Sequence, residues 1–147
     1  MIREASLSTL ELAEELRPAV LRLARNLRKE TDALGVTSHQ ATLLALVQAR
    51  PGLSLRELAR EEGISAPSLS GHIDRLEAVG LLRRVRSTDD RRRVGLELTA
   101  EGRTLLRRVR ARRTTWLAER LATLADDEHE RLEGALPALR ALLERSP

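Results

Sequence analysis

Six arginines lie within eleven residues of this sequence, between positions 83 and 93, and they offer its clearest chemistry. They are Arg83, Arg84, Arg86, Arg91, Arg92 and Arg93. Each guanidinium presents a planar fork of N–H donors that fits phosphate oxygens and the edge of a guanine base. With Asp89 and Asp90 included, the stretch has the same net charge, +4, as the whole chain. This concentration predicts a surface that binds a polyanion; the alternative is a solvated turn that aids solubility.

The composition favours double-stranded DNA as that polyanion. Proteins that bind single strands stack the bases on several aromatic side chains, whereas Trp116 is the only Phe, Tyr or Trp among 147 residues. Lys29 is the single lysine, and a GC-rich genome is the simpler explanation for most of the other arginines. The location of the arginines is therefore more informative than their number.

The arginine-rich stretch coincides with a predicted β-hairpin. Val94, Leu96 and Leu98 alternate with small or charged residues, which is the period of a half-buried strand. Residues 81–86 give a weaker strand signal, and the connection between the two segments is short and charged. The pattern predicts a hairpin with a basic tip.

Around this hairpin, apolar residues recur with a helical period, and most of the segments begin with a capping residue. Ser8 with Glu11 and Thr37 with Gln40 have the spacing of capping boxes. Pro18 is expected to kink or interrupt the first helix. The predicted helices are 8–33, 37–50, 54–62, 65–80, 99–124 and a last one capped by Asp126.

The third and fourth predicted helices form a helix-turn-helix, because a tight turn with Gly63 at the helix C-cap joins them. The hairpin that follows adds a wing. On a helical wheel of the fourth helix, Leu69, Ile73 and Leu76 face inward. The opposite face begins small and polar and ends with a base, which suits a helix that enters the major groove of DNA. Its candidate DNA contacts are Pro67, Ser68, Ser70, Gly71 and Arg75.

Several residues of this helix can also be explained by structure alone, without a contact to DNA. Ser68 and Ser70 can be ordinary exposed positions, and His72 lies at the edge of the buried face, where a local bond is expected. Gly71 costs about 1 kcal/mol relative to alanine inside a helix, which close approach to DNA, close packing against another helix or simple tolerance would explain. Asp74 would repel phosphate, so we expect it to pair with a neighbouring arginine and hold it in place.

The segment SLSGHIDRLEAVGLLRRVRSTDDRRRVGLELTAEG, residues 68–102, closely resembles the recognition helix, wing and following helix of MarR-type transcriptional regulators. The most specific matches are DRLEAVGLL, the DRR at 90–92 and the LTAEG at 98–102. LRELAREEGIS, at 55–65, is similar to the first part of the family's helix-turn-helix. The resemblance implies one mainly α winged helix-turn-helix domain over 1–147, with six helices and one small hairpin.

By this resemblance, residues 37–98 form the DNA-binding lobe, and 6–34 with 100–147 supply the helices of a homodimer. Asp90 is expected to brace the wing, while Arg92 or Arg91 enters the minor groove. Ser54, Ser65, Arg84, Arg86 and Arg93 complete the candidate DNA-binding residues. The leucine stripes of the terminal helices independently favour a dimer, because apolar faces of that length need a partner. A two-fold dimer predicts a pseudo-palindromic operator.

The resemblance also implies a repressor, released by a small-molecule effector bound between the DNA-binding lobe and the dimer helices. Arg17, His39 and Trp116 are the candidate effector contacts, and ordinary packing and surface charge are the alternative. No cofactor or metal site is expected, since cysteine is absent and His39, His72 and His129 lack ligand spacing. No catalytic motif predicts an enzyme.

The sequence lacks a signal peptide and any apolar run long enough for a membrane span, so a cytoplasmic location is expected. Recognition of DNA sequence rests on few side chains that can bond a base bidentately. A non-specific architectural DNA-binding protein is therefore the alternative function.

Overall fold

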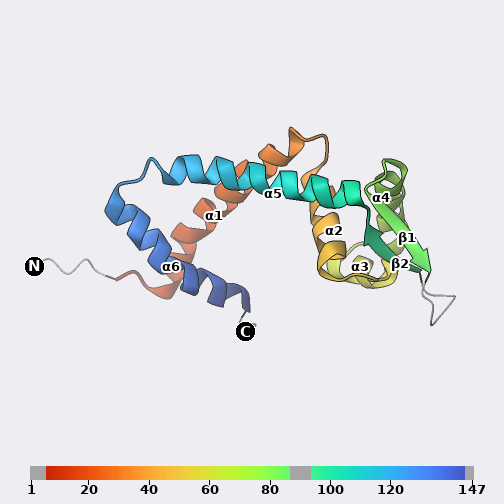
Figure 1. The fold of residues 1–147 in the computed structure, drawn as a ribbon. Helices are drawn as coiled ribbons and strands as arrows, with labels where there is room; N and C mark the ends of the chain where they lie inside the picture. Colours follow the sequence, from red (N-terminus) through yellow and green to blue (C-terminus); the bar gives the residue numbers. More distant parts are fainter. Residues whose placement is uncertain (1–5, 87–93, 145–147) are drawn as a thin grey trace, which may run out of the picture. The chain divides into compact units, whose positions relative to one another are not determined.

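The computed structural model describes residues 6–86 and 94–144 (Figure 1). These residues form six helices and one antiparallel hairpin, which confirms the mainly α winged helix-turn-helix fold. The elements are α1 (Thr9–Asp32), α2 (Ser38–Ala49), α3 (Leu55–Glu62), α4 (Ala66–Ala78), β1 (Leu82–Arg86), β2 (Val94–Leu98), α5 (Ala100–Leu121) and α6 (Asp126–Glu144). The chain divides into two compact units, 1–113 and 114–147, with α5 continuing from one into the other.

The starts of α1, α2, α3 and α4 are where local capping chemistry predicts them. Capping boxes at Ser8, Thr37 and Ser54 begin α1, α2 and α3, and the Ser65 hydroxyl accepts the Ser68 backbone N–H at the start of α4. Each cap satisfies N–H groups that lack a partner within the helix. Gly63 ends α3 with a φ of 63°, in the left-handed conformation that favours glycine.

Three details differ from the sequence prediction. The helix α1 continues through Pro18, so the interruption that this residue suggested does not occur. The helix α5 ends at Leu121, before Leu124. Asp126 is the first residue of α6 rather than its cap, and the N–H of Ala125 before it is accepted by the Glu128 carboxylate. The acidic side chains in the first turn of α6 are also stabilised by the positive end of the helix dipole.

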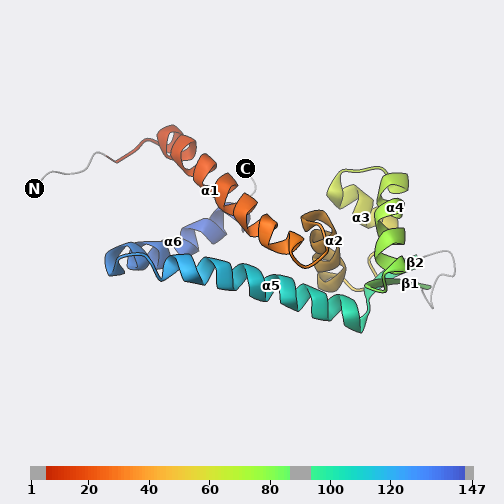
Figure 2. The same cartoon turned by 90° about the horizontal axis from the view of Figure 1, so that it is seen from above.

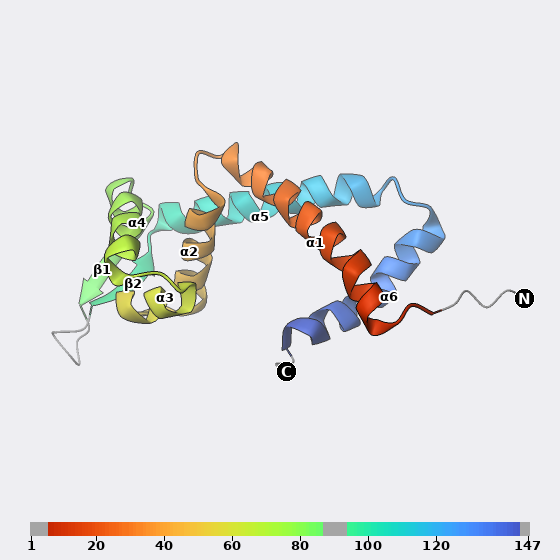
Figure 3. The same cartoon turned by 180° about the vertical axis from the view of Figure 1, so that it is seen from behind.

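One hydrophobic core holds the helix-turn-helix and the hairpin together. Figures 2 and 3 show α2, α3, α4 and the two strands gathered beside the first turns of α5. Buried side chains come from each of these elements: Leu43, Leu44, Leu58, Leu69, Ile73, Leu76, Leu82, Leu96 and Leu106. Burial of apolar surface stabilises the fold by about 25 cal/mol per Å². Because α4 and the two strands share this core, we expect them to fold as one cooperative unit.

The base of the hairpin is also tied to the loop between α2 and α3. The strands pair from Leu82 opposite Leu98 to Arg86 opposite Val94. On the other edge of β2, the Leu96 N–H donates to the Leu53 carbonyl at 3.0 Å, and its carbonyl accepts the Gly52 N–H at 3.3 Å. A Cβ on Gly95 would lie 3.0 Å from the Gly52 Cα and O atoms. The wing therefore begins from a fixed base.

A second close contact joins the start of α5 to the start of the hairpin. The Thr99 hydroxyl donates to the Gly80 carbonyl at 2.6 Å and accepts the Gly102 N–H at 3.0 Å. A Cβ on Gly102 would lie 2.0 Å from the Leu81 carbonyl oxygen. This approach requires glycine, so the LTAEG segment has a structural reason for its last residue.

Two arginines of α5 connect it to α1 and α2 within residues 1–113. Arg113 donates to the hydroxyl of Thr31, which is fully buried, at 3.0 Å, and to the Ser38 hydroxyl at 3.4 Å. Arg112 pairs with Glu30 at 3.0 Å. These bonds fix the C-terminal end of α1 and the start of α2 against α5.

Candidate nucleic-acid interface

The helix α4 has the buried and exposed faces predicted for a recognition helix. Leu69, Ile73 and Leu76 are fully buried. The predicted outward residues Pro67, Ser68 and Arg75 are exposed, while Ser70 and Gly71 are partly exposed. The Ser65 hydroxyl also donates to the Ser68 hydroxyl at 2.9 Å. The N-terminal half of α4 is therefore a small polar surface that a groove edge can approach closely.

The surroundings of Gly71 remove one explanation for this glycine. A Cβ at this position would meet only the guanidinium of Arg75, 4.0 Å away, among the described residues. No neighbouring helix of the described chain therefore requires glycine here. Close approach to DNA and simple tolerance remain, and the first agrees with the exposed face on which Gly71 lies.

A short chain of side-chain contacts connects Arg75 to Glu62 at the end of α3. Its guanidinium lies 3.3 Å from His72 Nδ1. The His72 ring makes an edge contact with His39 of α2, with ring centroids 4.9 Å apart, and His39 Nδ1 lies 3.9 Å from the carboxylate of Glu62. The predicted local bond of His72 is thus present. An arginine donor next to Nδ1 requires that this nitrogen carries no proton.

The environment of His72 predicts a pH dependence of folding stability. Burial lowers the pKa of His72 from its usual value of 6.5, and the positive charges of His39 and Arg75 lower it further. As pH falls below that value, the unfolded chain takes up the proton before the folded protein does. Stability is therefore lost as pH falls from the unfolded pKa to the lower folded pKa.

The variant His72→Gln removes the titrating group and keeps an oxygen acceptor for Arg75. Between about pH 8 and about pH 5, its unfolding free energy should fall less than that of the wild type. Urea denaturation at each pH measures both proteins. Parallel curves would show that His72 protonation does not oppose folding.

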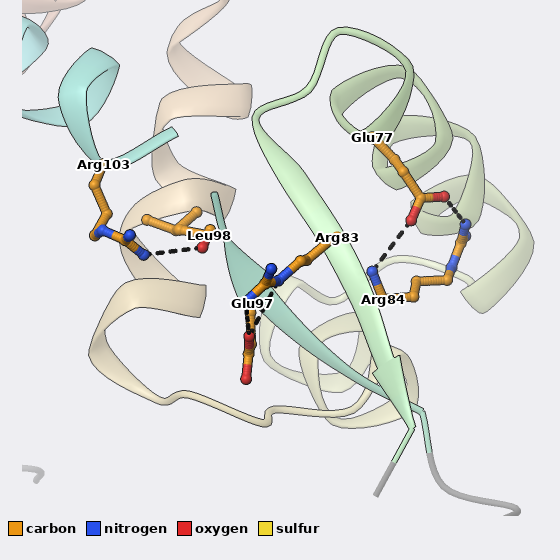
Figure 4. Close-up of polar contacts among 6 residues, drawn as sticks. All are labelled: Glu77, Arg83, Arg84, Glu97, Leu98 and Arg103. Atoms are coloured by element: carbon orange, nitrogen blue, oxygen red, sulfur yellow. Dashed lines mark hydrogen bonds and ion pairs between the residues drawn. The ribbon is translucent and has the colours of Figure 1, made fainter. Parts of the chain in front are cut away.

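The three arginines on β1 lie in different environments, and Figure 4 shows two of them, Arg83 and Arg84. Arg83 pairs with Glu97 directly across the hairpin, with its Nη2 3.0 Å from the carboxylate. Arg84 points to α4, where it bonds both Asp74 and Glu77 at 2.8 Å. Arg86 is exposed at the end of the strand. The predicted pairing of Asp74 with an arginine is therefore present.

The contacts of Arg84 also affect its charge. The hydrogen bond that Arg84 donates to the Asp74 carboxylate is the largest cause that raises the pKa of Arg84, and the nearby charge of Glu77 acts in the same direction. Arg84 therefore stays ionised, with its donors directed at carboxylates. Asp90, Arg91, Arg92 and Arg93, the predicted wing-tip residues, lie outside the described residues.

Ser54 and Ser65, the two remaining candidates, both cap helices. The Ser54 hydroxyl accepts the Glu57 N–H at 3.2 Å, and the Ser54 backbone forms a bridge with Gly95. Ser54 is partly buried beside β2, whereas Ser65 is exposed at the start of α4. Sequence reasoning placed Asp74 correctly but missed Glu77 and Glu97 as arginine partners. The strand register, which places Arg83 opposite Glu97, is the signal that could have found the second pair.

The three candidate effector contacts lie in separate surroundings. Arg17 is exposed on α1, and His39 is engaged with His72 and Glu62. Trp116 belongs to residues 114–147, where the Arg120 guanidinium lies 3.6 Å from the centre of its ring. A shallow cavity of about 390 Å³ beside the start of α5 contains none of these residues. It is lined by Leu81, Ala100, Glu101, Thr104, Leu105 and Arg108.

Residues 6–86 and 94–144 hold no group of three or more His, Asp or Glu side chains that could bind a metal ion. Within the same ranges, no helix is both long and apolar enough to cross a membrane.

Comparison with known proteins shows which family the sequence is similar to. A sequence model described as the MarR family matches residues 34–93. The chain is 33% identical over 140 residues to an uncharacterised HTH-type transcriptional regulator of Mycobacterium bovis, covering 95% of this chain and 98% of the relative. It is 29% identical over 128 residues to the HTH-type transcriptional repressor MdtR of Bacillus subtilis, covering 87% of this chain and 78% of that protein.

A solved structure of a variant of MepR from S. aureus, bound to an oligodeoxyribonucleotide, has the same fold. It matches with a TM-score of 0.70 at 19% identity, over 94% of this chain and 99% of that one. At this identity the match shows the fold alone.

Proposed function

This chain belongs to the MarR family of HTH-type transcriptional regulators, and we propose that it binds a specific operator in double-stranded DNA as a homodimer. The observation that carries the proposal is the exposed, small and polar N-terminal half of α4, rigidly joined through one core to an arginine-rich hairpin. A helix of this shape fits the major groove, and a basic hairpin beside it is suited to the adjacent minor groove.

In this proposal the two elements read DNA differently. Ser68, Ser70 and Gly71 approach the base edges, and Arg75 bonds a guanine through its fork of donors. Arg92 or Arg91 enters the narrow minor groove, where the negative potential is deepest. Flanking arginines bind phosphates, with Arg86 and Arg93 as the candidates, and set affinity rather than sequence preference.

The dimer is supported by apolar surface on the terminal helices. On α1, Leu10 is 70% exposed, and Leu12, Val20, Leu21 and Leu23 are exposed as well. On α6, Leu143 is 89% exposed, and Leu132, Leu136, Leu139 and Leu142 are exposed to a smaller extent. Side chains of this kind on two long helices favour burial against a second copy of the chain. Two copies would present two recognition helices to a pseudo-palindrome.

Removal of residues 126–147 is expected to abolish the dimer, because it deletes the leucine face of α6 that is proposed to be buried against the second copy. Light scattering after size-exclusion chromatography measures the mass. The variant Leu136→Glu tests the same face without deleting a helix, and Glu130→Gln, an exposed change on the opposite side of α6, is its control. A monodisperse dimer of the truncated chain would place the interface elsewhere.

We further propose that the protein represses transcription and that a small-molecule effector releases it from DNA. The name of the relative MdtR as a repressor supports the first part. Arg17, His39 and Trp116 remain the proposed effector contacts. An effector acts by favouring a spacing of the two recognition helices that no longer fits successive major grooves.

The specificity of DNA binding distinguishes this function from its alternative. A duplex obtained by selection and an unrelated duplex of equal length are compared in near-physiological salt. A specific regulator binds its site at least about 10³-fold more tightly than other DNA. A non-specific architectural protein, the second candidate, binds both equally, with an affinity that falls steeply with salt. Failure to bind either duplex would contradict both functions.

A further inference from the structure

Among the described residues, Arg84 connects the hairpin to α4 through hydrogen bonds of its side chain and its backbone, and Figure 4 shows those to Glu77. Its Nη1 donates to Glu77 Oε1 and its Nη2 to Asp74 Oδ1, both at 2.8 Å. The backbone N–H of Arg84 donates to the second Glu77 oxygen at 3.1 Å. Three hydrogen bonds thus connect one residue of β1 to two carboxylates on successive turns of the recognition helix.

The geometry is that of a rigid connection rather than a loose surface pair. Two donors of one planar guanidinium are used at once, which fixes orientation as well as distance. The Arg84 side chain is 31% exposed, whereas that of Arg83, paired within the hairpin, is 63% exposed. Partial burial reduces solvent screening of the charges. The Arg84 contacts join two different elements, while the Arg83 contact joins two strands that are already paired.

We infer that Arg84 is a positioning residue, which holds the wing at a fixed place relative to the recognition helix. This role differs from the direct DNA contact predicted from the sequence, and it rests on the proposed function. Helix and wing must meet neighbouring grooves at the same time, so their relative placement determines whether both sets of contacts form. With its donors bound to Asp74 and Glu77, Arg84 sets that placement without contacting DNA.

The two acids make the inference unusually easy to test, because electrostatics alone predicts the opposite result. Asp74 and Glu77 carry negative charge on the helix that approaches phosphate. Their neutralisation adds two positive charges to the net charge of the DNA-binding lobe, which by charge alone should tighten binding to any duplex. If the acids hold the wing through Arg84, their neutralisation should instead weaken binding to the operator.

The experiment measures the affinity of the full chain for its selected operator as a function of salt. The variant with both Asp74→Asn and Glu77→Gln should bind about tenfold more weakly than wild type. Arg84→Gln should show a similar loss, with the slope of log affinity against log salt unchanged. An arginine that contacts phosphate would lower that slope by about 1. Hydroxyl-radical footprinting should show reduced protection of the flanking minor groove in both variants.

Glu97→Gln is the matched control, because it neutralises an acid on the same hairpin whose arginine partner does not reach α4. Its affinity should stay within about twofold of wild type. Asp74→Asn alone, at an exposed position, provides a mild second variant should the double variant unfold, and thermal melting checks each protein. Tighter or unchanged binding by the acid variants, or a reduced salt slope for Arg84→Gln, would overturn the inference. Absence of binding by the wild type would instead contradict the proposed function.

Discussion

Replacement of Arg92 by alanine is expected to weaken binding to the operator by about 1–3 kcal/mol, on the order of 5- to 150-fold in Kd. The reason is the loss of a guanidinium from the minor groove, where the negative potential of DNA is greatest. Arg92 stands between β1 and β2 in the sequence and lies outside the described residues. The base of the hairpin is fixed by the backbone bonds of Leu96 to Leu53 and Gly52. Fluorescence anisotropy with a labelled operator duplex measures the change.

The matched control is Arg107→Ala, which removes the same charge from an exposed position on α5. It should change the affinity by less than about twofold, because surface charges far from a partner are largely screened. Both variants should remain dimers by light scattering. Equal affinity of Arg92→Ala and wild type, with Arg91→Ala also unchanged, would remove the wing from the mechanism.

Replacement of Gly102 by alanine is expected to destabilise the protein by about 3 kcal/mol or more. The added Cβ would lie 2.0 Å from the Leu81 carbonyl oxygen, which is backbone and has little freedom to move. The start of α5 would have to shift, and with it the bonds that Thr99 makes to Gly80 and Gly102. Guanidinium denaturation followed by circular dichroism gives the unfolding free energy.

Gly134→Ala on α6 is the corresponding control. A Cβ there meets nothing within 4 Å among the described residues, so alanine should stabilise the helix by about 0.5–1 kcal/mol through its higher helix propensity. Opposite signs for the two substitutions are the expected result. A Gly102→Ala protein as stable as wild type would show that the close approach of α5 to Leu81 is not required.

The elements of this protein could be predicted from sequence because their boundaries depend on local chemistry. Ser54 caps α3, Gly63 ends it with a positive φ, and Ser65 begins α4, as the spacing of these residues indicates. The inward face of α4 follows from the same helical period. Pro18 shows the limit of such reasoning: a helix can continue through a proline when its other hydrogen bonds remain, and only the structure shows that it does.

The roles of the individual arginines could not be predicted, because they depend on how β1 lies against α4. From residue type alone, each of the six arginines is an equally good candidate to bind a DNA phosphate. The structure separates Arg83, paired across the hairpin, from Arg84, directed at Asp74 and Glu77. Glycines show the same dependence: a Cβ on Gly71 would meet only the end of the Arg75 side chain, whereas a Cβ on Gly95 or Gly102 would meet the backbone of distant segments.

The central claim, sequence-specific binding by a dimer, is tested most directly by selection of bound duplexes from a random DNA library in near-physiological salt, followed by sequencing. The account predicts enrichment of a pseudo-palindrome whose half-sites are separated by about 10 base pairs or a multiple of that distance. Recovery of bound DNA without any enriched sequence, or of no DNA at all, would contradict it.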